Sequence, residues 1–206
     1  MVGAPKKRRA TYQDVLDAPE HLVAEIIDGD LRLSPRPAGP HTAAHSRLGV
    51  LLGAPFDLGQ GGPGGWIILV EPELHFDDDI VVPDLAGWRR ERLPFVDDVA
   101  YFTLAPDWAC EVLSPSTKVH DRAEKLPIYA RAGIKHVWFV NAPIRTLEIL
   151  RLHEGKWLIV DIHRGDVKVR AEPFDAIELD LAVLWANLAP PPQPSRASEA
   201  AANYVL

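Results

Sequence analysis

Short apolar runs bounded by turn residues recur along most of the chain, which is the pattern of β-strands. Asp28-Gly29 and His153-Glu154-Gly155 each separate two such runs and predict hairpin turns, and Asp77-Asp78-Asp79 predicts a third turn. The predicted strands cover residues 22–27, 31–33, 66–70, 73–76, 80–86, 108–113, 136–140, 146–152, 156–161 and 166–170. The chain is therefore expected to be rich in β-structure.

Helical spacing occurs in fewer segments. Thr11, with Asp14 three positions later, predicts the N-cap of a short helix. Segment 117–132 is charged and amphipathic, Gly133 is suited to end it, and Pro127 predicts a kink or a late start. Further helices are predicted over residues 41–52, within the loop 89–101 and within 177–188. Together with the strands, these helices predict an α+β or mixed α/β fold.

Length and composition are those of one globular domain with tails. We predict a single domain over residues 11–188, between a basic disordered N-terminus (1–10) and a disordered tail rich in Pro and Ala (189–206). No apolar run approaches the roughly 20 residues that span a bilayer, and no apolar stretch follows the basic N-terminus as in a secretory signal. The single cysteine, Cys110, excludes an intrachain disulfide and a cysteine zinc cluster. A cytoplasmic protein without membrane contact is expected.

The formal charge argues against a broad nucleic-acid surface. It is −7, and removing the +4 of residues 6–9 leaves −11 on the rest of the chain. Binding to phosphates is driven by Lys and Arg that displace counterions. An acidic metal pocket contributes to such a balance, however, and a local basic rim can still hold a phosphate backbone. The charge alone therefore does not exclude a nuclease.

Glu111 is a carboxylate in the middle of an apolar strand, residues 108–113. Such a strand is usually buried on both faces, where a carboxylate must be paired, hydrogen-bonded or bound to a metal. Strand alternation places Glu111 on the same face as Ala109 and Leu113. From this strand alone, a metal ligand and a buried ion pair with Arg or Lys are equally good interpretations.

Asp84 follows a second apolar strand. Pro83 cannot donate to a sheet ladder, so strand pairing is expected to end or distort at Asp84. A plain turn aspartate is the alternative. Lys125 lies on the helix that follows the Glu111 strand, with Asp121 and Tyr129 on the same face. It could be half of a surface ion pair, or it could reach a site shared with both acids if the helix packs beside the strand end, with Ser114–Thr117 as the connecting turn.

The order of these elements resembles the Uma-two family of restriction-endonuclease-like proteins, within the PD-(D/E)XK nuclease superfamily. The resemblance spans roughly residues 12–185 and also includes Glu25-Ile26-Ile27-Asp28-Gly29-Asp30, Ser34-Pro35 and His45. The segments that carry it are Val-Pro-Asp (82–84), Cys-Glu-Val-Leu-Ser-Pro-Ser-Thr (110–117), Asp-Arg-Ala-Glu-Lys-Leu-Pro-Ile-Tyr (121–129) and Ala-Gly-Ile-Lys-His-Val-Trp-Phe-Val (132–140). It implies a restriction-endonuclease-like core, in which helices flank a central mixed sheet, with an N-terminal helix and hairpin and a C-terminal β extension.

The resemblance also implies roles for individual residues. Asp84 and Glu111 match the two acids and would hold the metal. The simplest superfamily pattern has a lysine two positions after the second acid, where this chain has Leu113, and Lys125 matches the lysine that the family carries on the next helix instead. Glu25 matches an early glutamate that could be a further ligand or could support the ligands, and His45 could also face the site.

The function implied is Mg²⁺-dependent hydrolysis of phosphodiester bonds in DNA, with Mn²⁺ as a possible substitute and no organic cofactor. A homodimer is expected by analogy, because cutting both strands of a duplex takes two sites. Two alternatives stay open. One is a catalytically inactive binding or regulatory module with the nuclease fold, which the acidic charge favours, and the other is a different carboxylate-pair hydrolase such as a glycosidase.

Four further patterns are interpreted as structural. His41 and His45 have the spacing of a zinc-binding helix but lack the glutamate that a zinc protease needs, so a core or surface histidine is the better interpretation. The Asp77–Asp79 run has no EF-hand spacing and predicts a solvated turn. The glycine-rich segment 61–65 lacks the Lys-Ser/Thr of a phosphate loop. Trp108 and Trp138 lie in apolar runs and are expected in the core.

Overall fold

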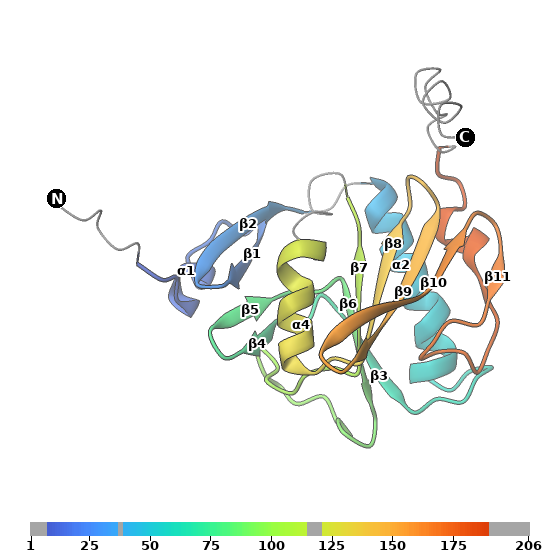
Figure 1. The fold of residues 1–206 in the computed structure, drawn as a ribbon, viewed down its shortest axis with the longest axis horizontal. Helices are drawn as coiled ribbons and strands as arrows, with labels where there is room; N and C mark the ends of the chain where they lie inside the picture. Colours follow the sequence, from blue (N-terminus) through green and yellow to red (C-terminus); the bar gives the residue numbers. More distant parts are fainter. Residues whose placement is uncertain (1–7, 37–38, 115–120, 190–206) are drawn as a thin grey trace.

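The computed structural model describes residues 8–36, 39–114 and 121–189 (Figure 1). The predicted disorder of residues 1–7 and 190–206 lies outside the described residues, as does the predicted turn at residues 115–117. Within the described residues, no helix is both long and apolar enough to cross a bilayer.

A six-stranded mixed sheet forms the centre of the fold, in the order β10-β9-β8-β7-β6-β3. Strands β7 and β8 are parallel, and the other neighbours are antiparallel. The strands are β3 (Trp66–Val70), β6 (Leu85–Arg89), β7 (Trp108–Val112), β8 (His136–Asn141), β9 (Thr146–His153) and β10 (Lys156–Arg164). The β7–β8 connection carries the predicted helix, since a parallel pair needs a crossover. The predicted central mixed sheet is confirmed.

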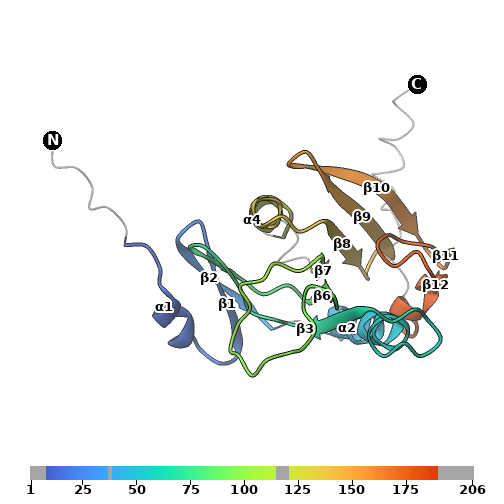
Figure 2. The same ribbon diagram turned by 90° about the horizontal axis from the view of Figure 1, so that it is seen from below.

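A smaller four-stranded sheet, in the order β2-β1-β5-β4, lies beside the first. The hairpin β1 (Leu22–Ile27) and β2 (Asp30–Pro35) follows the short helix α1 (Tyr12–Leu16), as predicted. The backbone N–H of Thr11 donates to Asp14 at 2.7 Å and closes the start of α1. Strands β4 (Leu74–Phe76) and β5 (Asp79–Val81) complete the sheet, because β5 pairs with β1. Figure 2 shows this unit at one side of the molecule.

The single strand predicted over residues 80–86 is wrong. The segment forms two strands in two sheets, β5 and β6, and the chain crosses between the sheets at residues 82–84. Pro83 has no N–H for a ladder, and the Val82 N–H donates to the side chain of Glu25 at 2.8 Å instead of to a strand. The predicted interruption of pairing just before Asp84 is therefore confirmed. It is a change from one sheet to another, whereas the sequence indicated only a break within one strand.

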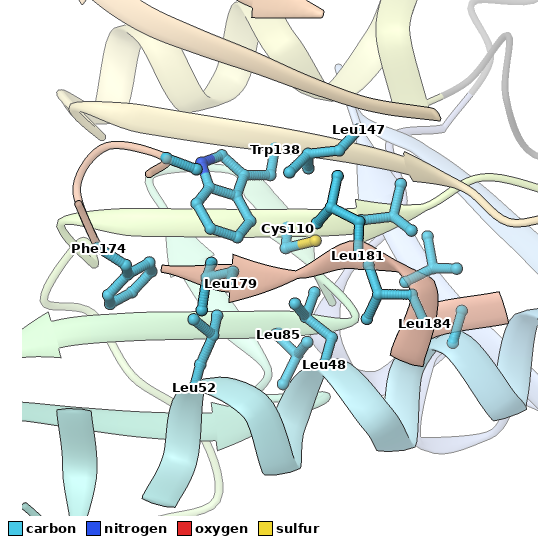
Figure 3. Close-up of a cluster of buried hydrophobic side chains, with 14 of the residues drawn as sticks. Leu48, Leu52, Leu85, Cys110, Trp138, Leu147, Phe174, Leu179, Leu181 and Leu184 are labelled. Carbon is cyan, nitrogen blue, oxygen red and sulfur yellow. The ribbon is translucent and has the colours of Figure 1, made fainter. Parts of the chain in front are cut away.

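Helices cover opposite faces of the large sheet, and strand alternation explains how. Helix α2 (Gly39–Leu52), with η1 (Gly53–Asp57), packs on the face that carries Trp108 and Cys110. Helix α4 (Leu126–Ala132) packs on the face that carries Ala109 and Leu113. The first face is closed by β11 (Lys168–Val169), β12 (Leu179–Asp180) and η3 (Leu181–Trp185), whose leucines meet those of α2 (Figure 3). Trp108 and Trp138 are fully buried, as predicted.

Two other predictions need correction. Segment 89–101 contains no helix: it begins with the last residue of β6 and continues in turns and loop. Asp79 is not a solvated turn residue: it is buried, where its carboxylate accepts from the Asp28 N–H at 2.7 Å and from Arg131 at 2.8 Å. The helix of segment 117–132 is described from Asp121, where a π-turn (η2, Asp121–Lys125) precedes α4. Pro127 lies in the first turn of α4, which is a late start, and Gly133 ends the helix with a φ of 78°.

Candidate active site

Glu111 lies in the most enclosed part of the large sheet. Strand β7 has β6 on one side and β8 on the other, and all five of its residues are buried. The side chain of Glu111 therefore emerges from an apolar strand, as the sequence predicted, and the residue is only 2% exposed. Its neighbours on that face come from α4 and the preceding π-turn.

Lys125 supplies the positive charge that such a burial requires. Its Nζ lies 3.2 and 3.3 Å from the two carboxylate oxygens of Glu111, 2.9 Å from Oε1 of Glu25 and 3.7 Å from Oδ1 of Asp121. It also donates to the Val82 carbonyl at 3.2 Å. Lys125 is 5% exposed, and its acidic neighbours are buried too. We call Glu25, Glu111, Asp121 and Lys125 the carboxylate–lysine cluster.

Tyr129 adds a hydrogen bond from one turn further along the helix. Its hydroxyl donates to Oε1 of Glu111 at 2.5 Å, and the ring is fully buried. The Asp121, Lys125 and Tyr129 side chains therefore do converge from one helical side, although a π-turn rather than an α-helix carries the first two.

The cluster has more acids than bases, and this sets the direction of its pKa shifts. Burial raises the pKa of Glu111 well above its usual range; Lys125 opposes this, while Asp121, Asp84 and Glu25 add to it. Burial acts to lower the pKa of Lys125, but Glu111, Glu25 and Asp121 outweigh it, so that pKa lies well above its usual range. Burial, then Glu111, raises the pKa of Tyr129. Lys125 is thus held as a cation and Tyr129 as a hydrogen-bond donor.

Asp84 immediately precedes β6, directly after the break at Pro83. Leu85 pairs with Cys110, and Asp84 precedes Leu85, so Asp84 lies beside the end of β7 that carries Glu111 and Val112. The Asp84 carboxylate accepts from the Val112 N–H at 2.7 Å and lies 3.1 Å from Nε2 of His41. The negative charge of Asp84 raises the pKa of Glu111.

The predicted site residues thus fall into two adjoining groups. Glu25, Glu111 and Lys125 meet in one cluster. Asp84 lies next to it, but its closest side-chain contact is to His41 on α2, and His45 belongs with this second group. Sequence reasoning set His41 aside and gave Tyr129 and Asp121 no role at the site. The i, i+4 histidine spacing was the signal for His41, but the carboxylate that it meets lies 43 residues away in the chain.

The donor set suits a hard divalent cation. The carboxylates of Glu25, Glu111 and Asp121 and the Val82 carbonyl surround the Lys125 ammonium. Asp84 lies close enough to raise the pKa of Glu111. Mg²⁺ prefers oxygen ligands and is bound through one or two carboxylates while it keeps several waters. Asp84 and Glu111 are the pair that could hold such an ion from neighbouring strands.

The central mixed sheet with helices on both faces is a restriction-endonuclease-like fold. A solved structure of a protein described as a "putative nuclease" from Anabaena variabilis has this fold: it aligns with a TM-score of 0.67 and 23% sequence identity, over 86% of this chain and 98% of that one. Residues 10–183 match the profile of the Uma2 family, described as "Putative restriction endonuclease". The chain belongs to this family. No match was found among curated proteins.

Proposed function

We propose that this protein is a divalent-metal-dependent endonuclease that hydrolyses phosphodiester bonds in DNA. The observation that carries the proposal is the buried contact of Glu111 with Lys125, beside Asp84, whose negative charge acts on Glu111 at the break between two sheets. An excess of buried acids does not by itself stabilise the fold. Titratable groups with perturbed pKa values cluster at functional sites. Family membership supports the same chemistry.

In the proposed mechanism, Asp84 and Glu111 would hold the cation, Mg²⁺ or Mn²⁺. When bound, the cation would supply Lewis-acid stabilisation of the phosphoryl oxygens and lower the pKa of the attacking water. Lys125 stays protonated among its carboxylates, so it stabilises developing negative charge and orients the water rather than accepting a proton. Glu25 and Tyr129 position Lys125 and Glu111 through the contacts described above.

The direct test is nicking of supercoiled plasmid DNA by the purified full-length protein. We expect activity with Mg²⁺ or Mn²⁺, none with excess EDTA, and a loss of about 10²–10³-fold in Asp84→Asn. The reason is that metal stabilisation of the transition state is worth several kcal/mol, and about 1.4 kcal/mol corresponds to each tenfold. Asp97→Asn makes the same change at an exposed position and should leave nicking unchanged. Equal activity of wild type and Asp84→Asn would reject the assignment.

A second candidate function is favoured by the acidic charge: a binding or regulatory module that keeps the fold without cleavage. This candidate predicts DNA binding, measured by fluorescence anisotropy, and no nicking with any divalent cation. The same plasmid experiment therefore separates the two candidates.

We further propose that the protein acts as a homodimer, since each chain offers one such cluster and a duplex has two strands. The edge of the large sheet supports this. Among the described residues, strand β10 has a neighbour on one side only, and it exposes apolar side chains. Such edges pair readily with other strands. The exposed residues are Leu158, Ile159, Val160 and Ile162.

Ile159→Lys is expected to shift the protein from dimer to monomer, because a charge on an edge strand opposes pairing. Analytical ultracentrifugation at micromolar concentration measures the shift. Val50→Lys, on the exposed side of α2, is the matched control and should stay dimeric. A wild-type protein that sediments as a monomer would contradict the dimer.

A further inference from the structure

Two histidines of α2 form a second group of potential ligands outside the carboxylate–lysine cluster. His41 and His45 are one helical turn apart and so lie on one face of the helix, with ring centroids 6.1 Å apart. They are 8% and 7% exposed, which makes both more than nine-tenths buried. Histidine at such a depth is normally held by hydrogen bonds from both ring nitrogens.

These two rings are not fully satisfied. Among the residues that the structure describes, Nδ1 of His41 and Nε2 of His45 are buried and have no hydrogen-bond partner. An unmet buried polar atom is unfavourable and calls for an explanation, such as an ion. The other nitrogen of His41 contacts Asp84 at 3.1 Å.

Asp84 completes the group. His41, His45 and Asp84 each offer one ligand atom, and these atoms lie within 4.8 Å of one another. Metal–nitrogen bonds of about 2.0–2.1 Å require neighbouring ligand atoms roughly 3.4 Å apart, so small side-chain rotations close the group around an ion. The Asp84 side chain is 13% exposed and gives the group an opening toward solvent.

We propose that His41, His45 and Asp84 form a binding site for a divalent transition-metal ion such as Zn²⁺ or Co²⁺, distinct from an all-oxygen Mg²⁺ site. Imidazole nitrogen suits transition metals, whereas Mg²⁺ prefers carboxylate, carbonyl and water oxygens. Three protein ligands, two His and one carboxylate, leave coordination positions free for water or a ligand. The site is not that of a zinc protease, since Thr42 stands where that motif has its glutamate.

The site does not depend on the proposed nuclease activity, because the ligands would bind an ion whether or not DNA is cleaved. It does share Asp84 with the proposed magnesium pair. An ion held by the histidines would therefore fix the Asp84 carboxylate, and it would lie beside the carboxylate–lysine cluster rather than within it.

The test is titration of the metal-free full-length protein with Co²⁺, followed by visible absorption and by isothermal titration calorimetry with Zn²⁺ and Mg²⁺. We expect one equivalent of Co²⁺ with ligand-field bands of a nitrogen-containing site, and binding that a hundredfold excess of Mg²⁺ does not displace. His45→Gln and His41→Gln should each weaken binding at least tenfold. His153→Gln, at the exposed end of β9, is the matched control and should bind as the wild type does.

Glu111→Gln distinguishes this site from the proposed magnesium site, since it removes a ligand of the latter only. We expect the cobalt spectrum to be retained in Glu111→Gln and lost in His45→Gln, with circular dichroism showing that both variants are folded. Absence of Co²⁺ binding in the wild type, unchanged binding in both histidine variants, or loss of the spectrum in Glu111→Gln would each overturn the proposal. Nicking activity enters none of these readouts.

Discussion

Replacing Lys125 with methionine is expected to lower the free energy of unfolding by about 3–5 kcal/mol, the range for removing one partner from a buried ion pair. The ammonium is within 4 Å of three buried carboxylates, those of Glu25, Glu111 and Asp121. Methionine has a similar shape but leaves these acids without that cation. Nicking should also fall by about 10²–10³-fold, the effect of losing one preorganised charge-stabilising group.

Chemical denaturation measures the first effect and plasmid nicking the second. Lys135→Met removes an exposed ammonium and should change neither. The double variant Lys125→Met/Glu111→Gln separates stability from catalysis: removing one acid together with the base should restore stability by a coupling of about 0.5–3 kcal/mol, while nicking stays lost. Full stability of Lys125→Met alone would mean that the cluster is not held by its charges.

The sequence predicted the contact of Glu111 with Lys125 because a carboxylate in an apolar strand conflicts with its local surroundings. Glu111 interrupts an apolar strand, and a buried acid needs a partner wherever the chain supplies one. The next helix carries Lys125 within reach of that strand, so their meeting follows from the β7–α4–β8 connection. Local pattern and connectivity are sufficient for such a contact.

The rest of the site depends on contacts that no local pattern encodes. Pro83 indicated a break in pairing, but not that β5 leaves for a second sheet and pairs with β1, which brings Glu25 to Lys125. Likewise, the histidine spacing on α2 was visible, but the position of α2 relative to Asp84 depends on packing across the whole core. Non-local pairing of this kind is set by tertiary structure.

The excess of acids in the carboxylate–lysine cluster also implies that replacing an acid and replacing the lysine change the free energy of unfolding by different amounts. Removing an acid leaves the lysine with other partners, while removing the lysine leaves several acids without their shared cation. Natural active sites often hold groups whose replacement stabilises the fold while it abolishes function. The carboxylate–lysine cluster holds more acids than bases, so an acid can be replaced there with loss of function and little loss of stability.

Glu111→Gln is accordingly expected to abolish nicking, by about 10²–10³-fold, with a change of less than about 1 kcal/mol in the free energy of unfolding. The activity is lost because the amide is a poor ligand for a cation whose stabilisation is worth several kcal/mol. Stability is kept because Lys125 retains Glu25 at 2.9 Å, while the amide oxygen still accepts from Tyr129. Burial already disfavours the charged form of Glu111, as the raised pKa of its carboxyl indicates.

Nicking rates and denaturation midpoints from the same preparations test this pair of effects. Glu91→Gln, at an exposed position, is the matched control and should match the wild type in both measurements. Unchanged nicking in Glu111→Gln would place the chemistry elsewhere. A stability loss as large as that of Lys125→Met would instead show that Glu111 is needed as an ion-pair partner, because only then would the acid and the base contribute equally to the fold.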